Sequence, residues 1–194
     1  MADRQPAPGQ LALVQAFVNT LDIETGQDEL CDPEALRAWL VERDLIEPDV
    51  ALGAADLRRA VQLREALREL LAAHHRGQDA APAQAVASLN AMAGAAPLRL
   101  RFAVDGNGEL APSRGGLNGA IARLLAMVYT AMVDGSWQRL KVCRADRCRW
   151  AFYDASKNRS GAWCAMQVCG NRTKVRSYQQ RRRAPGTAQP ASAP

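Results

Sequence analysis

Residues 143–172 read CRADRCRWAFYDASKNRSGAWCAMQVCGNR, and they hold four of the five cysteines in this 194-residue chain. The spacing is Cys143-x4-Cys148, then fifteen residues, then Cys164-x4-Cys169. Two closely spaced pairs joined by a longer loop are typical of a chain that surrounds one tetrahedral Zn²⁺ ion with four thiolates. The spacing therefore predicts one structural zinc ion, because four thiolates leave no coordination position open for water or substrate.

Other uses of four cysteines stay open at this point. An iron–sulfur cluster takes the same thiolates, although nothing else in the sequence indicates electron transfer. Disulfides are disfavoured, because the polar N-terminus lacks a signal-peptide core and we expect a cytoplasmic protein. No C-x-x-C redox pair is present, and the symmetric spacing argues against four unliganded cysteines. We expect the fifth cysteine, Cys31, in the core.

The charge of the chain divides at about residue 138. Residues 1–138 hold 12 Lys and Arg against 18 Asp and Glu, a net charge of −6. Residues 139–194 hold 13 Lys and Arg against two Asp, a net charge of +11, and the whole chain carries +5. An acidic body with a basic C-terminal end indicates two tasks in one chain, the basic end being suited to nucleic acid.

The segment before the cysteines has the apolar periodicity of helices. Apolar residues at helical spacing predict helices over residues 11–21 and 117–132 and a weaker one over 83–93. Two further helices are predicted from their start signals, one beginning at Asp32-Pro33-Glu34 and one capped by Asp56. In the helix after Asp56, Arg64 and Arg68 lie largely outside the apolar stripe. Residues 98–102 alternate with period two before turn residues 105–108, which predicts a small β-hairpin. No run is long enough for a membrane span, since the most apolar one, 121–133, contains Arg123.

We therefore predict a mostly α (α+β) protein. A helical domain with a small hairpin covers residues 8–136, a zinc module covers 139–183, and 184–194 form a disordered tail. Residues 171–183 contain no proline and read as a basic helix that begins after the fourth ligand. Five large side chains are expected to form a small core around the metal, with base stacking as the alternative use of the aromatic ones: Trp150, Phe152, Tyr153, Trp163 and Met166.

The motif Cys143-x4-Cys148-x-Trp150 and the tetrapeptide Cys169-Gly170-Asn171-Arg172 resemble the CGNR zinc finger family, as does the run from Asp154 to Ser160. Phe17-Val18-Asn19-Thr20, Trp39-Leu40 and Leu63 to Arg68 resemble the ABATE domain that usually precedes this finger. The two resemblances cover nearly all of residues 11–183. They imply a bacterial, stress-linked transcription regulator whose finger binds DNA. Where the family commonly has two arginines, Gly161 and Ala162 stand here, and Gln179 and Gln180 likewise replace basic residues.

Candidate nucleic-acid contacts are Arg159, Arg172, Lys174, Arg176, Arg181, Arg182 and Arg183. Of these, Arg172, Arg176 and Arg183 recur at helical spacing and share one face.

In the helical domain, Asn19, Thr20 and Arg64 could line a ligand pocket. Alternatively, Asn19 and Thr20 could cap the helix and turn the chain, and Arg64 could pair with a carboxylate. His74 and His75 fit a helix C-terminus. The body could also form a homodimer. No catalytic motif is present, so we expect a non-enzyme, and protein or RNA binding by the zinc module is the alternative to DNA.

Overall fold

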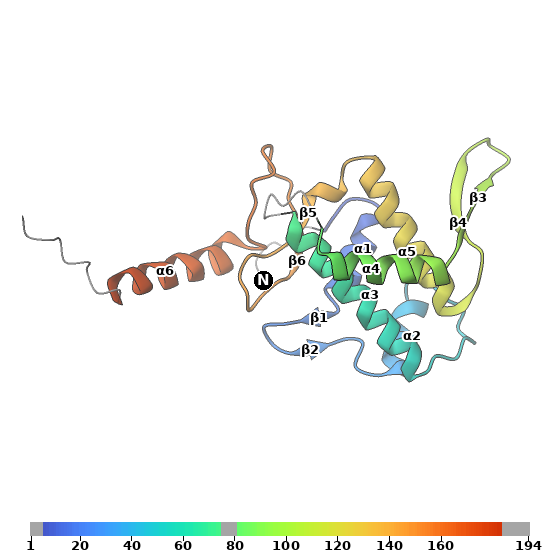
Figure 1. Cartoon of the computed structure of the whole chain (residues 1–194), viewed down its shortest axis with the longest axis horizontal. Helices are drawn as coiled ribbons and strands as arrows, with labels where there is room; N and C mark the ends of the chain where they lie inside the picture. The colour runs from blue at the N-terminus through green and yellow to red at the C-terminus, as the bar shows by residue number, and fades with distance from the viewer. Residues whose placement is uncertain (1–5, 75–80, 184–194) are drawn as a thin grey trace, which may run out of the picture.

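The computed structural model describes residues 6–74 and 81–183, and within the last helix it leaves out the side chains of residues 177, 178 and 180–183. The predicted tail at 184–194 and His75 lie outside the described residues. The chain forms a helical body, from which a β-hairpin projects at one end and the C-terminal helix at the other (Figure 1). The prediction of a mostly helical protein with a small β-hairpin is confirmed, and the described residues form two further two-stranded sheets.

Helices build the body. They are α1 (Leu11–Val18), α2 (Pro33–Val41), α3 (Ala54–Ala73), α4 (Ala83–Ala95) and α5 (Gly116–Val133). α1, α3 and α4 all pack on α5, whose Ile121 and Leu124 are each about 1% exposed. Among the described helices, α5 has the length and composition to cross a membrane; its Ile121, Leu124 and Val128 lie in the core of the body, whereas Tyr129, Met132 and Val133 are exposed.

Local side-chain chemistry sets two helix starts. Asp32 caps α2 as predicted, its carboxylate accepting from the Ala35 N–H at 2.8 Å, and Pro33 occupies the first helical position. The expectation that Asp56 caps α3 was wrong, because the cap is Gly53. Asp56 lies three residues further on and accepts from the Gly53 N–H at 2.9 Å, the return half of a capping box.

Three antiparallel hairpins complete the fold over the residues that the structure describes. The first, β1 (Leu21–Asp22) with β2 (Gln27–Asp28), begins just after α1, so the first helix ends earlier than its apolar spacing indicated. The predicted hairpin is β3 (Leu98–Phe102) with β4 (Gly108–Pro112). The third pairs β5 (Leu140–Val142) with β6 (Ala151–Tyr153) and precedes the last two cysteines.

The third hairpin belongs to the zinc module, yet it lies in the core of the body. Leu140, Val142 and Ala151 are each at most 3% exposed, in the same apolar cluster as the body helices, and β5 contacts α3 while β6 contacts α1. The short helix η1 (Trp137–Arg139) leads into the module, which ends with η2 (Met166–Gly170) and α6 (Asn171–Arg183). α6 has the bounds that the sequence predicts.

Candidate metal centre

The first two cysteines meet through a tight turn after β5. The Cys143 N–H donates to the carbonyl of Trp150 at 2.9 Å, which holds the two arms of the turn together. The N–H groups of Cys148 and Arg149 both donate to the Ala145 carbonyl, at 2.8 and 3.1 Å. Arg149 has a left-handed backbone (φ +46°), and this conformation turns the chain from Cys148 into β6.

The second pair lies where the chain enters the last helix. Cys164 is in the loop before η2, and Cys169 is in η2 itself, two residues before α6 begins. The Cys169 N–H donates to the Ala165 carbonyl at 2.9 Å, and the Cys169 carbonyl accepts from the Thr173 hydroxyl at 2.9 Å. The fourth ligand is therefore fixed to the first turn of α6.

All four sulfur atoms converge on one point. They lie within 4.8 Å of one another, and the Sγ–Sγ separations are 3.6 Å for Cys148 with Cys164 and 3.7 Å for Cys164 with Cys169. Four sulfurs at the usual Zn–S length around a tetrahedral ion would be about 3.8 Å apart. All four side chains are buried. The geometry and the donor set fit one zinc ion, and the chain binds zinc here.

The proton affinities of the thiols show why the cluster needs a cation. Hydrogen bonds from Cys148 and Cys164 lower the pKa of Cys143 to about 2, so one thiolate forms readily. Burial first, and then the negative charge of Cys143, raise the pKa of Cys169 to about 12. Hydrogen bonds to Cys143 and Cys148, together with burial, also raise the pKa of Cys164. A divalent cation is what allows four thiolates to coexist in this volume.

The predicted aromatic core around the metal is confirmed in part. Phe152 is buried among the four cysteines, and Trp150 and Trp163 pack against them while partly exposed. Two members were placed wrongly. Tyr153 packs on the core of the body instead, since alternate residues of β6 face opposite sides, and Met166 is 50% exposed at the start of η2.

A buried ion pair holds the loop between the two cysteine pairs. Lys141 Nζ donates to Asp154 Oδ2 at 2.7 Å, and both side chains are at most 5% exposed. Lys141 also donates to the carbonyls of Arg159 and Gly161, and Asp154 accepts from the N–H groups of Ser156 (3.0 Å) and Gly161 (2.8 Å). Burial alone would raise the pKa of Asp154, but the hydrogen bonds from Lys141 and Ser156 outweigh it and lower the pKa to about 2. Lys141 carries no signal in the sequence that marks it as a site residue, because it stands between apolar residues on a strand.

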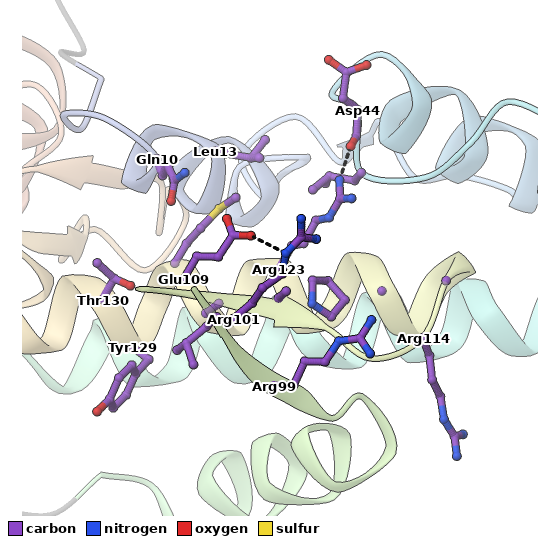
Figure 2. Close-up of a pocket in the computed structure, with 18 of the residues that line it drawn as sticks. Gln10, Leu13, Asp44, Arg99, Arg101, Glu109, Arg114, Arg123, Tyr129 and Thr130 are labelled. Carbon is purple, nitrogen blue, oxygen red and sulfur yellow. Dashed lines mark hydrogen bonds and ion pairs between the residues drawn. The ribbon is translucent and has the colours of Figure 1, made fainter. Parts of the chain in front are cut away.

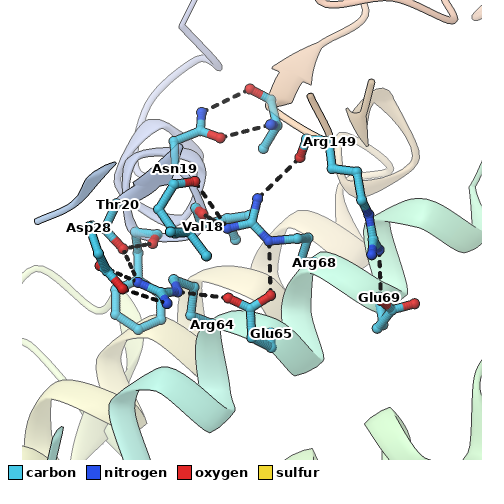
Figure 3. A network of polar contacts seen from close by, with 12 residues as sticks. Val18, Asn19, Thr20, Asp28, Arg64, Glu65, Arg68, Glu69 and Arg149 are labelled. Carbon is cyan, nitrogen blue, oxygen red and sulfur yellow. Dashed lines mark hydrogen bonds and ion pairs between the residues drawn. The ribbon is translucent and has the colours of Figure 1, made fainter. Parts of the chain in front are cut away.

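Asn19 joins the body to the zinc module (Figure 3). Its side-chain amide donates to the Ala151 carbonyl at 2.9 Å and accepts from the Ala151 N–H at 2.7 Å, and Gln15 donates to the same carbonyl at 3.2 Å. Ala151 is the first residue of β6. The polar atoms that were candidates for ligand binding at Asn19 are therefore used to hold β6 against α1.

Thr20 and Arg64 are also engaged within the protein. Arg64 is 2% exposed and donates two hydrogen bonds to the Asp28 carboxylate, at 2.7 and 3.0 Å, and one to Glu65 at 2.8 Å. The Thr20 hydroxyl donates to the Phe17 carbonyl and accepts a hydrogen bond from the Arg64 guanidinium at 3.2 Å. Of the two interpretations given above for Arg64, the structure shows pairing with a body carboxylate.

Arg68 connects α3 to the turn that carries the second ligand (Figure 3). It is fully buried and donates to Glu65 at 3.0 Å, to the Val18 carbonyl at 2.6 Å and to the Arg149 carbonyl at 3.1 Å. The Arg149 side chain donates to Glu69 at 2.6 Å. Helical periodicity placed Arg68 on the polar side of α3, and that expectation was wrong because the zinc module covers this side.

Two further expectations can be compared with the structure. Cys31 is exposed, and its sulfur lies 3.7 Å from Asp32 Oδ2, so the expectation that it packs in the core was wrong. His74 follows the last turn of α3 as expected, and its Nδ1 lies 2.7 Å from the Leu140 carbonyl. Burial lowers the pKa of His74, which favours a neutral ring donating to β5.

The predicted nucleic-acid residues lie on exposed parts of the module. Arg159, Lys174 and Arg176 are exposed, and Arg172, also exposed, forms an ion pair with Glu24 from the β1–β2 turn. The side chains of Arg181, Arg182 and Arg183 lie outside the described part of α6.

Comparison with known families covers almost the entire described chain. The ABATE family model, described as "Putative stress-induced transcription regulator", matches residues 11–135. The CGNR zinc finger model matches residues 139–182 and includes all four cysteines. No curated protein matches the chain.

Proposed function

Since this chain belongs to the ABATE family and carries a CGNR zinc finger, we propose that it is a zinc-containing transcription regulator that binds DNA through its C-terminal module. The helical body would sense a small molecule or form a dimer. The observation that carries the proposal is the junction at Cys169, where the fourth metal ligand leads directly into a basic helix. A metal site that fixes the start of such a helix also fixes its direction relative to the body.

α6 has the shape that a groove-binding helix needs. Its 13 residues span about 20 Å, and Figure 1 shows it extending away from the body with its length uncovered. Lys174 and Arg176 are exposed on it. A cationic helix of this length can lie in the major groove or along the phosphate backbone.

The balance of charge on the module supports an anionic polymer as partner. One of its two acidic residues, Asp154, is buried against Lys141, so Asp146 is the exposed acid. The zinc ion with four thiolates contributes a formal charge of −2, which leaves most of the +11 of residues 139–194 in place. Phosphate contacts would then supply most of the affinity, and salt would weaken it steeply.

We propose no catalytic activity, because the four thiolates saturate the metal. We also place the protein in the cytoplasm, where its thiols stay reduced.

The test of DNA binding is fluorescence anisotropy with the zinc-loaded full chain and random-sequence duplex DNA. We expect binding at low salt that weakens as salt rises. The double variant Lys174→Glu/Arg176→Glu should bind about tenfold or more weakly.

Arg58→Glu provides the matched control, since Arg58 is an exposed arginine at the far end of α3 from the module. This variant should bind DNA as tightly as the wild type. Absence of binding at low salt would contradict the proposal, as would an equal loss in the control. Tighter binding of a single-stranded RNA competitor would assign the module to RNA, and a partner retained at high salt would indicate protein recognition.

A further inference from the structure

A surface cavity of about 900 Å³ lies in the body, away from the zinc module. Its walls come from α1, residues 43–47, the β3–β4 hairpin and α5 (Figure 2). None of the residues that bind zinc or join the module to the body lines it. The cavity is therefore separate from the site described above.

Arginine is concentrated in this cavity. Five arginines line it, together with three acidic residues: Arg43, Arg99, Arg101, Arg114 and Arg123, with Asp44, Glu47 and Glu109. Residues 1–138 contain 12 Lys and Arg against 18 Asp and Glu, so the cavity reverses the charge balance of the acidic body around it. The cavity is therefore positively charged where the rest of the body is negative.

Much of this positive charge is not neutralised within the protein. Among the described residues, Arg99 has no hydrogen-bond or ion-pair partner, and Arg123 donates to a neutral group, the Asp44 carbonyl. Arg101 is 3.7 Å from Glu109 in an exposed pair, a contact of small energy. Arg99 and Arg101 lie on one face of β3, and they line the cavity together with Arg123 of α5 (Figure 2). Three guanidinium groups from two elements thus reach the same space.

The first turn of α5 adds to the positive potential. Its cap residue, Gly115, has no side chain to accept from the free N–H groups, and the first turn contains no acidic residue. Gly115, Gly116 and Gly119 all line the cavity, so backbone forms its wall there. The uncapped positive end of an 18-residue helix thus lies beside the arginines.

We propose that this cavity binds a small organic anion whose carboxylate or phosphate is held by Arg99, Arg101 and Arg123. Guanidinium groups bind both anions through paired hydrogen bonds. The apolar part of the ligand packs on Leu13, Leu45 and Met127, which line the same cavity. A bound anion would be the small molecule that the helical body is proposed to sense. Binding of the anion does not depend on that proposed role, whereas any regulatory effect of the anion rests on it.

The test is calorimetric titration of the zinc-loaded full chain, in low-salt buffer without phosphate, with phenyl phosphate, benzoate and phenol in turn. We expect at least one of the two anions to bind with a stoichiometry of one, and phenol not to bind. The better anion identifies whether phosphate or carboxylate is preferred. Arg99→Ala/Arg101→Ala should weaken that binding about tenfold or more, whereas Arg58→Ala should leave it unchanged.

Failure of both anions to bind overturns the proposal, as does an equal loss of binding in Arg58→Ala. The titration contains no DNA, so its failure leaves the DNA-binding proposal untouched. If the double arginine variant instead loses DNA affinity and no small anion binds, the arginines serve the DNA backbone and the proposal is wrong. Melting curves of both variants without ligand should match the wild type, which separates loss of binding from loss of folding.

Discussion

At the scale of single residues, the zinc module relies on buried polar pairs because its apolar core is small. Lys141 and Asp154 hold the loop at residues 154–161 with hydrogen bonds to backbone groups on both sides. Gly161 makes this packing possible, since a Cβ there would lie 2.7 Å from the Asp154 carboxyl carbon. Any larger side chain at position 161 would therefore require the loop to shift.

Removing one member of this pair should be costly. In Asp154→Asn, Lys141 remains buried without its counter-ion, and we expect the free energy of unfolding to fall by about 3–5 kcal/mol. Urea unfolding in excess zinc would measure it. Glu109→Gln, which breaks an exposed pair with Arg101, is the control and should change stability by less than about 1 kcal/mol.

The same pair predicts a pH profile. The pKa of Asp154 is lowered to about 2, so its contribution is fully present above the unfolded pKa near 4 and is lost only as the pH falls from there towards 2. The stability difference between the wild type and Asp154→Asn should thus be constant from pH 8 to pH 5.5. A difference that shrinks within this range would show that Asp154 titrates near neutrality.

At the scale of elements, close approach of backbones sets a glycine requirement in α5. A Cβ at Gly119 would lie 2.6 Å from the Arg114 carbonyl oxygen, which is backbone and cannot rotate away. By contrast, the space around Gly94 in α4 is open to 4 Å. Both residues are helical, so the same substitution at the two sites separates packing from helix propensity.

Gly119→Ala should lower the free energy of unfolding by about 1–3 kcal/mol, because overpacking outweighs the better helix propensity of alanine. Gly94→Ala should instead raise it by up to about 1 kcal/mol. Thermal unfolding of the two variants would measure both. Equal effects at the two sites would contradict the assigned packing of α5 against residues 112–114.

At the scale of the whole molecule, the β5–β6 hairpin of the zinc module lies in the core of the body, while the four cysteines form a separate cluster. β5 and β6 place Leu140, Val142 and Ala151 among the body helices, and Asn19 and Arg68 bind the backbone of the module. Loss of the metal leaves the four thiols without the cation that holds them together. Disorder in the module should therefore uncover part of the core of the body.

Removal of zinc by a chelator should consequently destabilise the helical body as well as the module. We expect a single thermal transition by far-ultraviolet circular dichroism, displaced downwards by about 10 °C or more, since a few kcal/mol moves the midpoint that far in a chain of this size. Cys148→Ser should behave like the chelated protein, and added zinc should rescue only the latter. A body transition that stays at its original temperature would show two independent units.

Local patterns in the amino-acid sequence predict the zinc site, the helix starting at Asn171 and most body helices. These features depend on residues close together along the chain: cysteine spacing, a helix-capping aspartate before proline, and apolar periodicity. Three features could be learned only from the folded chain: the burial of Arg68, the internal hydrogen bonds of Asn19 and Arg64, and the position of β5 and β6 in the core of the body. These features depend on how the zinc module packs on the body helices. The apolar periodicity of a single helix cannot show that another part of the chain will cover its polar side.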